Sequence, residues 1–109
     1  MTPPRRCRLD PPWYLVTEDD FEACFVVGLE QDPDAACNVD VEVVLSDGSR
    51  WGATLVTLAE VHRMMARSAY FWCPETVIVR DPGVAGMTAV ITGLLRKDDL
   101  RHVFRRLPD

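Results

Sequence analysis

Residues 39–56 read VDVEVVLSDGSRWGATLV, two apolar runs on either side of an Asp-Gly pair. In the first run valines alternate with polar residues, which gives an extended chain one apolar face. Asp-Gly is typical of the two-residue turns between antiparallel strands, because these turns need positive φ values that glycine adopts without strain. The stretch predicts a β-hairpin over 39–56, with a type I′ turn at Asp47 and Gly48.

A helix is predicted directly after the hairpin. Thr57 and Glu60 have the spacing of a capping box, in which each side chain accepts a hydrogen bond from a free backbone amide of the first turn. The apolar residues that follow recur at helical spacing and predict one apolar face. These residues are Leu58, Val61, Met64 and Met65.

The next strand is predicted at 76–80, after Pro74, which has no amide to donate to the ladder of a sheet. Three aromatic residues precede it. In an extended chain Tyr70 and Trp72 point to one side and Phe71 to the other. One side is therefore expected in the core, and only the other is available to a partner.

Two more helices are predicted near the C-terminus, over 84–95 and over 98–107, where apolar residues recur at helical spacing. Near the N-terminus, Thr17 is followed by three carboxylates, a pattern typical of a helix start. It predicts a helix from Thr17 to Gly28. A buried strand over 24–29 is the alternative.

The assembled elements predict an α+β fold, with an antiparallel sheet of three to four strands and helices packed on one face. Residues 13–109 are predicted to form this single domain. Residues 1–12 hold four prolines and three arginines and are predicted to be a flexible tail. A chain of 109 residues is long enough to bury roughly two-thirds of its unfolded surface, so a core of ordinary size is expected.

The composition excludes several classes of protein. The net charge is −5, from 12 basic and 17 acidic residues, and this sign argues against binding to the phosphate backbone of nucleic acids. The N-terminal residues lack the apolar region of a signal peptide, and no apolar run reaches the length of a membrane span. We expect a cytoplasmic protein with no nucleic-acid or membrane partner, and its four cysteines as reduced thiols.

No residue pattern predicts catalysis, a cofactor or a metal site. A calcium loop that starts at Asp32 would need oxygen ligands at Ala36 and Val43, where the sequence has none. Cys73 and His62 are the one candidate pair for a nucleophile and its base, provided that they meet in space. The protein is therefore predicted not to be an enzyme.

The charges are unevenly distributed along the chain. Eleven carboxylates and no basic residue lie between Leu9 and Ser49, whereas nine basic and six acidic residues lie from Arg50 onward. An acidic surface attracts a basic partner and complements its charge. Exposed aromatic side chains are the other common contributors to protein interfaces. The candidate contact residues are Asp19, Asp20, Asp32, Asp34, Trp51, Tyr70 and Trp72.

The run DGSRWGATLVTLAEVHRMM, followed by YFWCPETVIVRD, resembles small uncharacterised bacterial proteins, some of which are similar to immunity proteins of toxin systems. The resemblance covers about residues 39–107 and contains no catalytic residues. It implies a protein that works by binding another protein.

These observations predict a small protein-binding module without catalytic activity. Its most concrete form is an immunity-type inhibitor that covers a basic toxin with an acidic face. A small-ligand-binding module, with a pocket lined by Tyr70, Trp72, Met64 and Met65, is one alternative. A homodimer that pairs its exposed strand edges is another.

Overall fold

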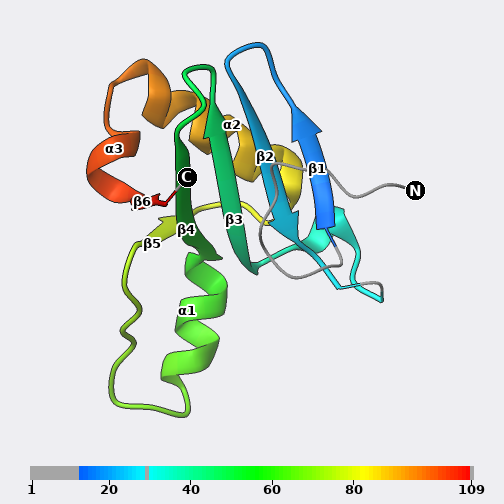
Figure 1. Cartoon of the computed structure of the whole chain (residues 1–109). Helices are drawn as coiled ribbons and strands as arrows, with labels where there is room; N and C mark the ends of the chain where they lie inside the picture. Colours follow the sequence, from blue (N-terminus) through cyan, green and yellow to red (C-terminus); the bar gives the residue numbers. More distant parts are fainter. Residues whose placement is uncertain (1–12, 29, 109) are drawn as a thin grey trace.

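Six strands form one sheet in the computed structural model, which describes residues 13–28 and 30–108 (Figure 1). The order is β1-β2-β3-β4-β5, and β6 pairs with β4 beside β5. All pairs are antiparallel except β4 with β5. The α+β class is confirmed, but the sheet has more strands than the three to four predicted. The strands are β1 Trp13–Thr17, β2 Phe21–Val26, β3 Asn38–Leu45, β4 Arg50–Thr57, β5 Thr76–Val79 and β6 Arg105–Leu107.

The predicted hairpin is present as β3 and β4, with Val41 opposite Ala53. Its turn differs from the prediction. The Leu45 amide donates to the Ser49 carbonyl at 2.9 Å, so that three residues form the loop, and Gly48 is at φ 85°. A type I′ turn would also need Asp47 at positive φ, which it is not. The glycine is required, but it closes a three-residue loop.

The helix predicted from Thr17 to Gly28 is wrong, because this region forms the hairpin of β1 and β2. The Glu18 amide donates to the Phe21 carbonyl at 2.8 Å, so the carboxylates lie in a turn between strands. Phe21 and Phe25 are buried, and Phe21 pairs with Leu45 of β3. The local sequence is compatible with a helix and with a strand, and pairing with the edge of β3 selects the strand.

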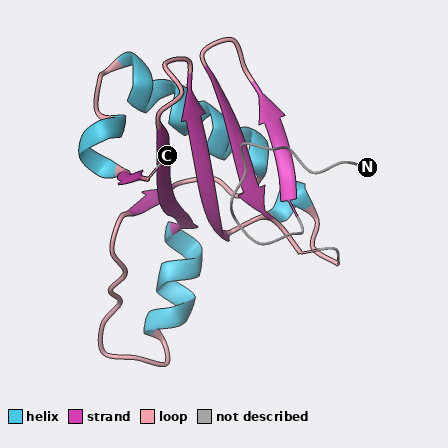
Figure 2. Cartoon of the chain, viewed as in Figure 1, coloured by secondary structure: helices cyan, strands magenta, loops and turns pink. Residues whose placement is uncertain are grey.

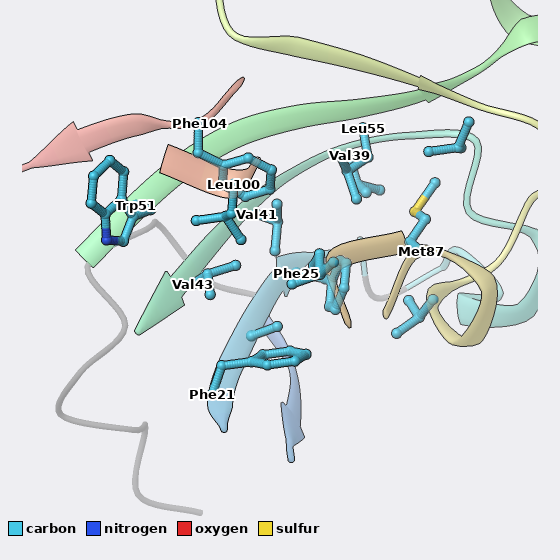
Figure 3. Packing of buried hydrophobic residues seen from close by; sticks show 14 of the residues in the cluster. Phe21, Phe25, Val39, Val41, Val43, Trp51, Leu55, Met87, Leu100 and Phe104 are labelled. Carbon is cyan, nitrogen blue, oxygen red and sulfur yellow. The ribbon is translucent and has the colours of Figure 1, made fainter. Parts of the chain in front are cut away.

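The core lies between the sheet and α2, Val84–Arg96, which crosses one face (Figure 1). Met87 and Ile91 of this helix are fully buried against the strands. The short helix α3, Leu100–Val103, closes one end of the same core with Leu100 and Phe104, close to Trp51 (Figure 3). The helix predicted over 84–95 is confirmed within one residue at its C-terminal end.

The last predicted helix, over 98–107, is wrong beyond Val103. Arg105–Leu107 form β6 and pair with Arg50–Gly52 at the start of β4. The strand β5 pairs only with Thr54–Thr57, which leaves the first part of that edge of β4 to β6. A tertiary contact therefore overrides the helical spacing of the C-terminal residues.

The helix predicted after the hairpin is α1, Leu58–Met65. The Thr57 hydroxyl accepts a hydrogen bond from the Glu60 amide at 3.1 Å, as predicted. The Glu60 carboxylate, by contrast, bonds Arg63 and the Cys37 thiol, so the second half of the capping box is not seen. This helix continues from the end of β4 and extends away from the sheet (Figure 2). Packing on one face thus holds for α2 and not for α1.

Among the helices of residues 13–28 and 30–108, none has the length and apolarity needed to cross a membrane. Cys37 and Cys73 are free thiols, but Cys24 on β2 is disulfide-bonded, so the prediction of reduced cysteines throughout is wrong. The predicted tail, residues 1–12, lies outside the described residues.

Candidate protein-binding surfaces

Most exposed large apolar side chains lie in one region, residues 58–79, which we call the arm. The arm consists of α1, the irregular segment 66–75 and β5. It extends from the end of the sheet opposite the two hairpin turns (Figure 1). Five of the seven exposed large apolar side chains of the described residues belong to it. They are Leu58, Met65, Tyr70, Trp72 and Ile78.

Tyr70 and Trp72 are the most exposed of these, at 74% and 78% of their full surface. Phe71, between them, is half-buried, so the predicted separation of the three aromatics is present. The separation could be predicted from the two-residue period of an extended chain. The two-residue period does not predict which of the two sides faces solvent.

The segment that carries these aromatics is fixed at its C-terminal end. The Thr76 hydroxyl donates to the carbonyl of Cys73 at 2.9 Å, and the Thr54 amide of β4 donates to the carbonyl of Glu75 at 3.0 Å. Glu75 is at φ 46°, an unusual conformation for a residue with a side chain. One local hydrogen bond and one hydrogen bond to β4 therefore hold the chain at residues 73–76, shortly after Trp72.

Trp51, another predicted contact residue, belongs to the core. It is 8% exposed, and its indole nitrogen donates to the Ser49 hydroxyl at 2.9 Å. The guanidinium groups of Arg101 and Arg106 lie 5.8 Å and 5.5 Å from its ring centre, within the range of cation–π attraction. Burial leaves Trp51 out of the surface that a partner could contact.

A second candidate surface, the acidic end, consists of Glu18, Asp19 and Asp20 in the β1–β2 turn and Asp47 in the β3–β4 turn. Both turns lie at the same end of the sheet (Figure 1). The four residues line a cleft of about 500 Å³, together with basic residues from α2 and α3. Those basic residues are Arg96 and Arg101.

One carboxylate of the acidic end is held by neighbours within the protein. Asp47 accepts hydrogen bonds from the hydroxyl and the amide of Ser49, and these hold the pKa of its carboxyl below the ordinary value. Arg101 lies 3.3 Å from Asp47 and favours the charged form further. The negative charge of Asp47 is thus partly compensated by Arg101. Glu18, Asp19 and Asp20 are exposed, as Asp47 is.

Asp32 and Asp34 lie at the other end of the sheet, after β2. Asp32 caps a single 3₁₀ turn, η1 Pro33–Ala35, and accepts a hydrogen bond from the Asp34 amide at 2.9 Å. The predicted acidic face is therefore divided. The structure brings Asp19 and Asp20 together with Asp47 and does not bring them together with Asp32 and Asp34.

The thiol of Cys37 is free and half-buried. It donates to the Glu60 carboxylate at 3.2 Å, beside a cleft that Arg63 also lines. Burial, and then the hydrogen bond to Glu60, raise the pKa of Cys37 above the ordinary 9.0. A reactive cysteine needs the thiolate, so this environment disfavours nucleophilic chemistry.

The other candidates for chemistry are not assembled either. His62 is exposed on α1 and Cys73 is a free, half-buried thiol, and no hydrogen bond joins the two side chains in the part of the chain that is described. Within residues 13–28 and 30–108, no three His, Cys, Asp or Glu side chains are placed to hold a metal ion.

The fold and these two surfaces define an α+β domain with an apolar arm and an acidic end. No known protein family matches this chain, and neither a curated protein nor a solved structure is significantly similar to it. The resemblance to immunity proteins therefore stays a hypothesis.

Proposed function

We propose that this protein is a small protein-binding module without catalytic activity and that the arm is its main contact surface. The observation that carries the proposal is the exposure of Tyr70 and Trp72, which are 74% and 78% accessible. Tyrosine and tryptophan are enriched among the few residues that dominate binding energy. Apolar groups gathered on one part of a surface are typical of interaction sites.

The hydrogen bonds around Glu75 and Thr76 give this surface a further advantage. Because the chain after Trp72 is held against β4, part of the ordering cost of binding is met before a partner arrives. The same exposure argues against the alternative of a small-ligand pocket. A pocket buries most of the ligand between side chains, whereas Tyr70 and Trp72 are themselves mostly exposed to solvent.

An immunity-type inhibitor that uses an acidic face is the second candidate function. The supporting observation is the group of exposed carboxylates Glu18, Asp19 and Asp20 in one turn. A basic toxin would be attracted to this end by charge, and its binding would weaken as salt increases. In this form of the proposal Asp32 and Asp34 belong to a separate part of the surface.

A capture experiment with three versions of the tagged chain separates the two surfaces. The versions are the wild type, the arm variant Tyr70→Ser with Trp72→Ser, and the acidic-end variant Glu18→Gln, Asp19→Asn and Asp20→Asn. We expect a partner from extracts of the source cell to bind the wild type and the acidic-end variant and to be lost from the arm variant. Loss from the acidic-end variant alone would favour the inhibitor, and equal capture by all three would overturn the proposal.

The predicted compartment is part of the same proposal. The sequence predicts the cytoplasm, whereas the disulfide at Cys24 favours an oxidising compartment, because disulfides persist mainly there. Fractionation of the source cells with an antibody to the chain would decide.

A further inference from the structure

We infer that the partner of the arm is a second copy of this chain, which forms a twofold dimer through the arms. The inference rests on the proposed function, since it identifies what covers the same aromatic surface. Three features of the arm support it: an apolar helix face that is only partly covered, an exposed apolar area that could form the centre of a dimer interface, and a balance of charge that allows self-association.

The first feature is the apolar face of α1. Its stripe consists of Leu58, Val61, Met64 and Met65, but only Val61 is buried. No residue of α1 belongs to the core cluster of the described chain. A short helix in water gains most of its stability from packing of its apolar face, and in the described chain this face is only partly covered, with Leu58 and Met65 exposed.

The second feature is area. A tyrosine or tryptophan offers about 150–250 Å² for burial, and Tyr70 and Trp72 expose about three quarters of theirs. With Leu58, Met65 and Ile78, the apolar side chains of one arm expose roughly 500 Å² or more. A stable interface of standard size buries about 800 Å² on each partner, including its polar rim. The exposed apolar side chains of one arm therefore amount to roughly 60% of that area, and the polar rim would supply the remainder.

The third feature is charge. The whole chain carries −5, but residues 58–78 contain two carboxylates, Glu60 and Glu75, and two guanidinium groups, Arg63 and Arg67. In a twofold interface each surface meets its own copy, so any net charge would be repelled. The neutral arm avoids this repulsion, whereas contact between two acidic ends would not. The acidic end then lies away from the interface, at the far end of each sheet.

The strand β5 gives the arms a place to align. It is the last strand of the sheet on this side and carries the exposed Ile78. An edge strand presents backbone amides and carbonyls that can pair with another chain. The other sheet edge, β1, exposes Tyr14 and Leu15 and is the competing surface.

Sedimentation equilibrium of the full chain over a wide concentration range tests the inference. The arm variant is Tyr70→Ser with Trp72→Ser, and the matched control is Tyr14→Ser with Leu15→Ser on β1. We expect the wild type and the control to dimerise, and the arm variant to do so about 100-fold more weakly, about tenfold for each of the two substitutions, each of which removes two side chains from the dimer. Circular dichroism should show that all three are folded, because every changed side chain is exposed.

A wild type that stays monomeric at every concentration would overturn the inference, as would a dimer that is lost only in the β1 variant. Neither result decides the proposed function. If the wild type is monomeric while the arm variant still loses a different captured protein, the protein-binding role stands and the second copy does not. If the arm variant changes neither dimerisation nor capture, both proposals fail.

Discussion

The helices α1 and α2 differ in what covers them, although each carries an apolar stripe. Val84, Met87 and Ile91 of α2 are buried against the sheet, whereas α1 buries only Val61. The difference comes from the connections. Thr57 is both the last residue of β4 and the cap of α1, which leaves no loop to bring α1 back over the sheet. An apolar stripe therefore indicates that a helix needs cover, and topology decides where the cover comes from.

The two helices should differ most when one aliphatic side chain in each is truncated to alanine. Ile91→Ala removes a fully buried side chain from the core and is expected to lower the free energy of unfolding by about 2–5 kcal/mol. Leu58→Ala removes an exposed one and is expected to change it by less than about 0.5 kcal/mol in dilute solution. Urea denaturation measures both. Equal losses would mean that α1 belongs to the core of the monomer.

Alanine substitutions at Gly83 and Gly93 test the connection that returns α2 to the sheet. Gly83 precedes α2 at φ 103°, and a Cβ atom there would lie 2.7 Å from the Asp34 carbonyl oxygen. Gly83→Ala should cost about 2 kcal/mol, from the strained φ and this contact. Gly93 lies within α2 with no neighbour near its Cβ position.

We expect the matched variant Gly93→Ala to stabilise the protein by about 0.5–1 kcal/mol, because alanine loses less backbone entropy than glycine in a helix. Thermal unfolding would report the two opposite signs. If both substitutions destabilise the protein equally, the close approach of Gly83 to η1 is not what holds α2 in place.

The N-terminal cap of α1 should have a smaller and more local effect. Thr57→Ala removes the acceptor of the Glu60 amide and is expected to cost about 1 kcal/mol, whereas Thr57→Ser should keep the hydrogen bond. Hydrogen exchange should become faster in α1 and stay unchanged in α2, because α1 contributes no residue to the core cluster that holds α2. Faster exchange throughout the chain would contradict the independence of the arm.

The sequence was sufficient where the signal is local. The hairpin of β3 and β4 follows from two apolar runs around Asp47 and Gly48, the first of which alternates over 39–43, and α1 follows from Thr57 and its spacing to the apolar stripe. The sequence was insufficient where the same residues suit both a helix and a strand. Phe21 and Phe25 are four apart and suit a helix, but they also lie on one face of a strand, and the edge of β3 selects the strand.

The candidate surface shows the same division. Alternation predicts that Tyr70 and Trp72 share a side, but exposure depends on how β5 docks on β4, which is a long-range contact. Trp51 has an aromatic side chain as suited to binding as that of Trp72. It is buried because α3 and β6 return over it from the far end of the chain, which no local pattern near residue 51 indicates.

The contact between Cys37 and Glu60 is where the arm meets the rest of the molecule away from β4, and it gives the smallest expected effect. Glu60 raises the pKa of the Cys37 thiol through its hydrogen bond and its charge, whereas Arg63 lowers it. Glu60→Gln removes the negative charge of Glu60 and leaves the positive charge of Arg63. The pKa of Cys37 should therefore fall, and its alkylation at mildly alkaline pH should become faster, because the thiolate is the nucleophile. Peptide mapping by mass spectrometry follows Cys37 separately from the free thiol of Cys73, whose rate should not change. If alkylation of Cys37 is equally fast in both proteins, Glu60 does not lie against the thiol in solution, and this contact between α1 and the rest of the domain is absent.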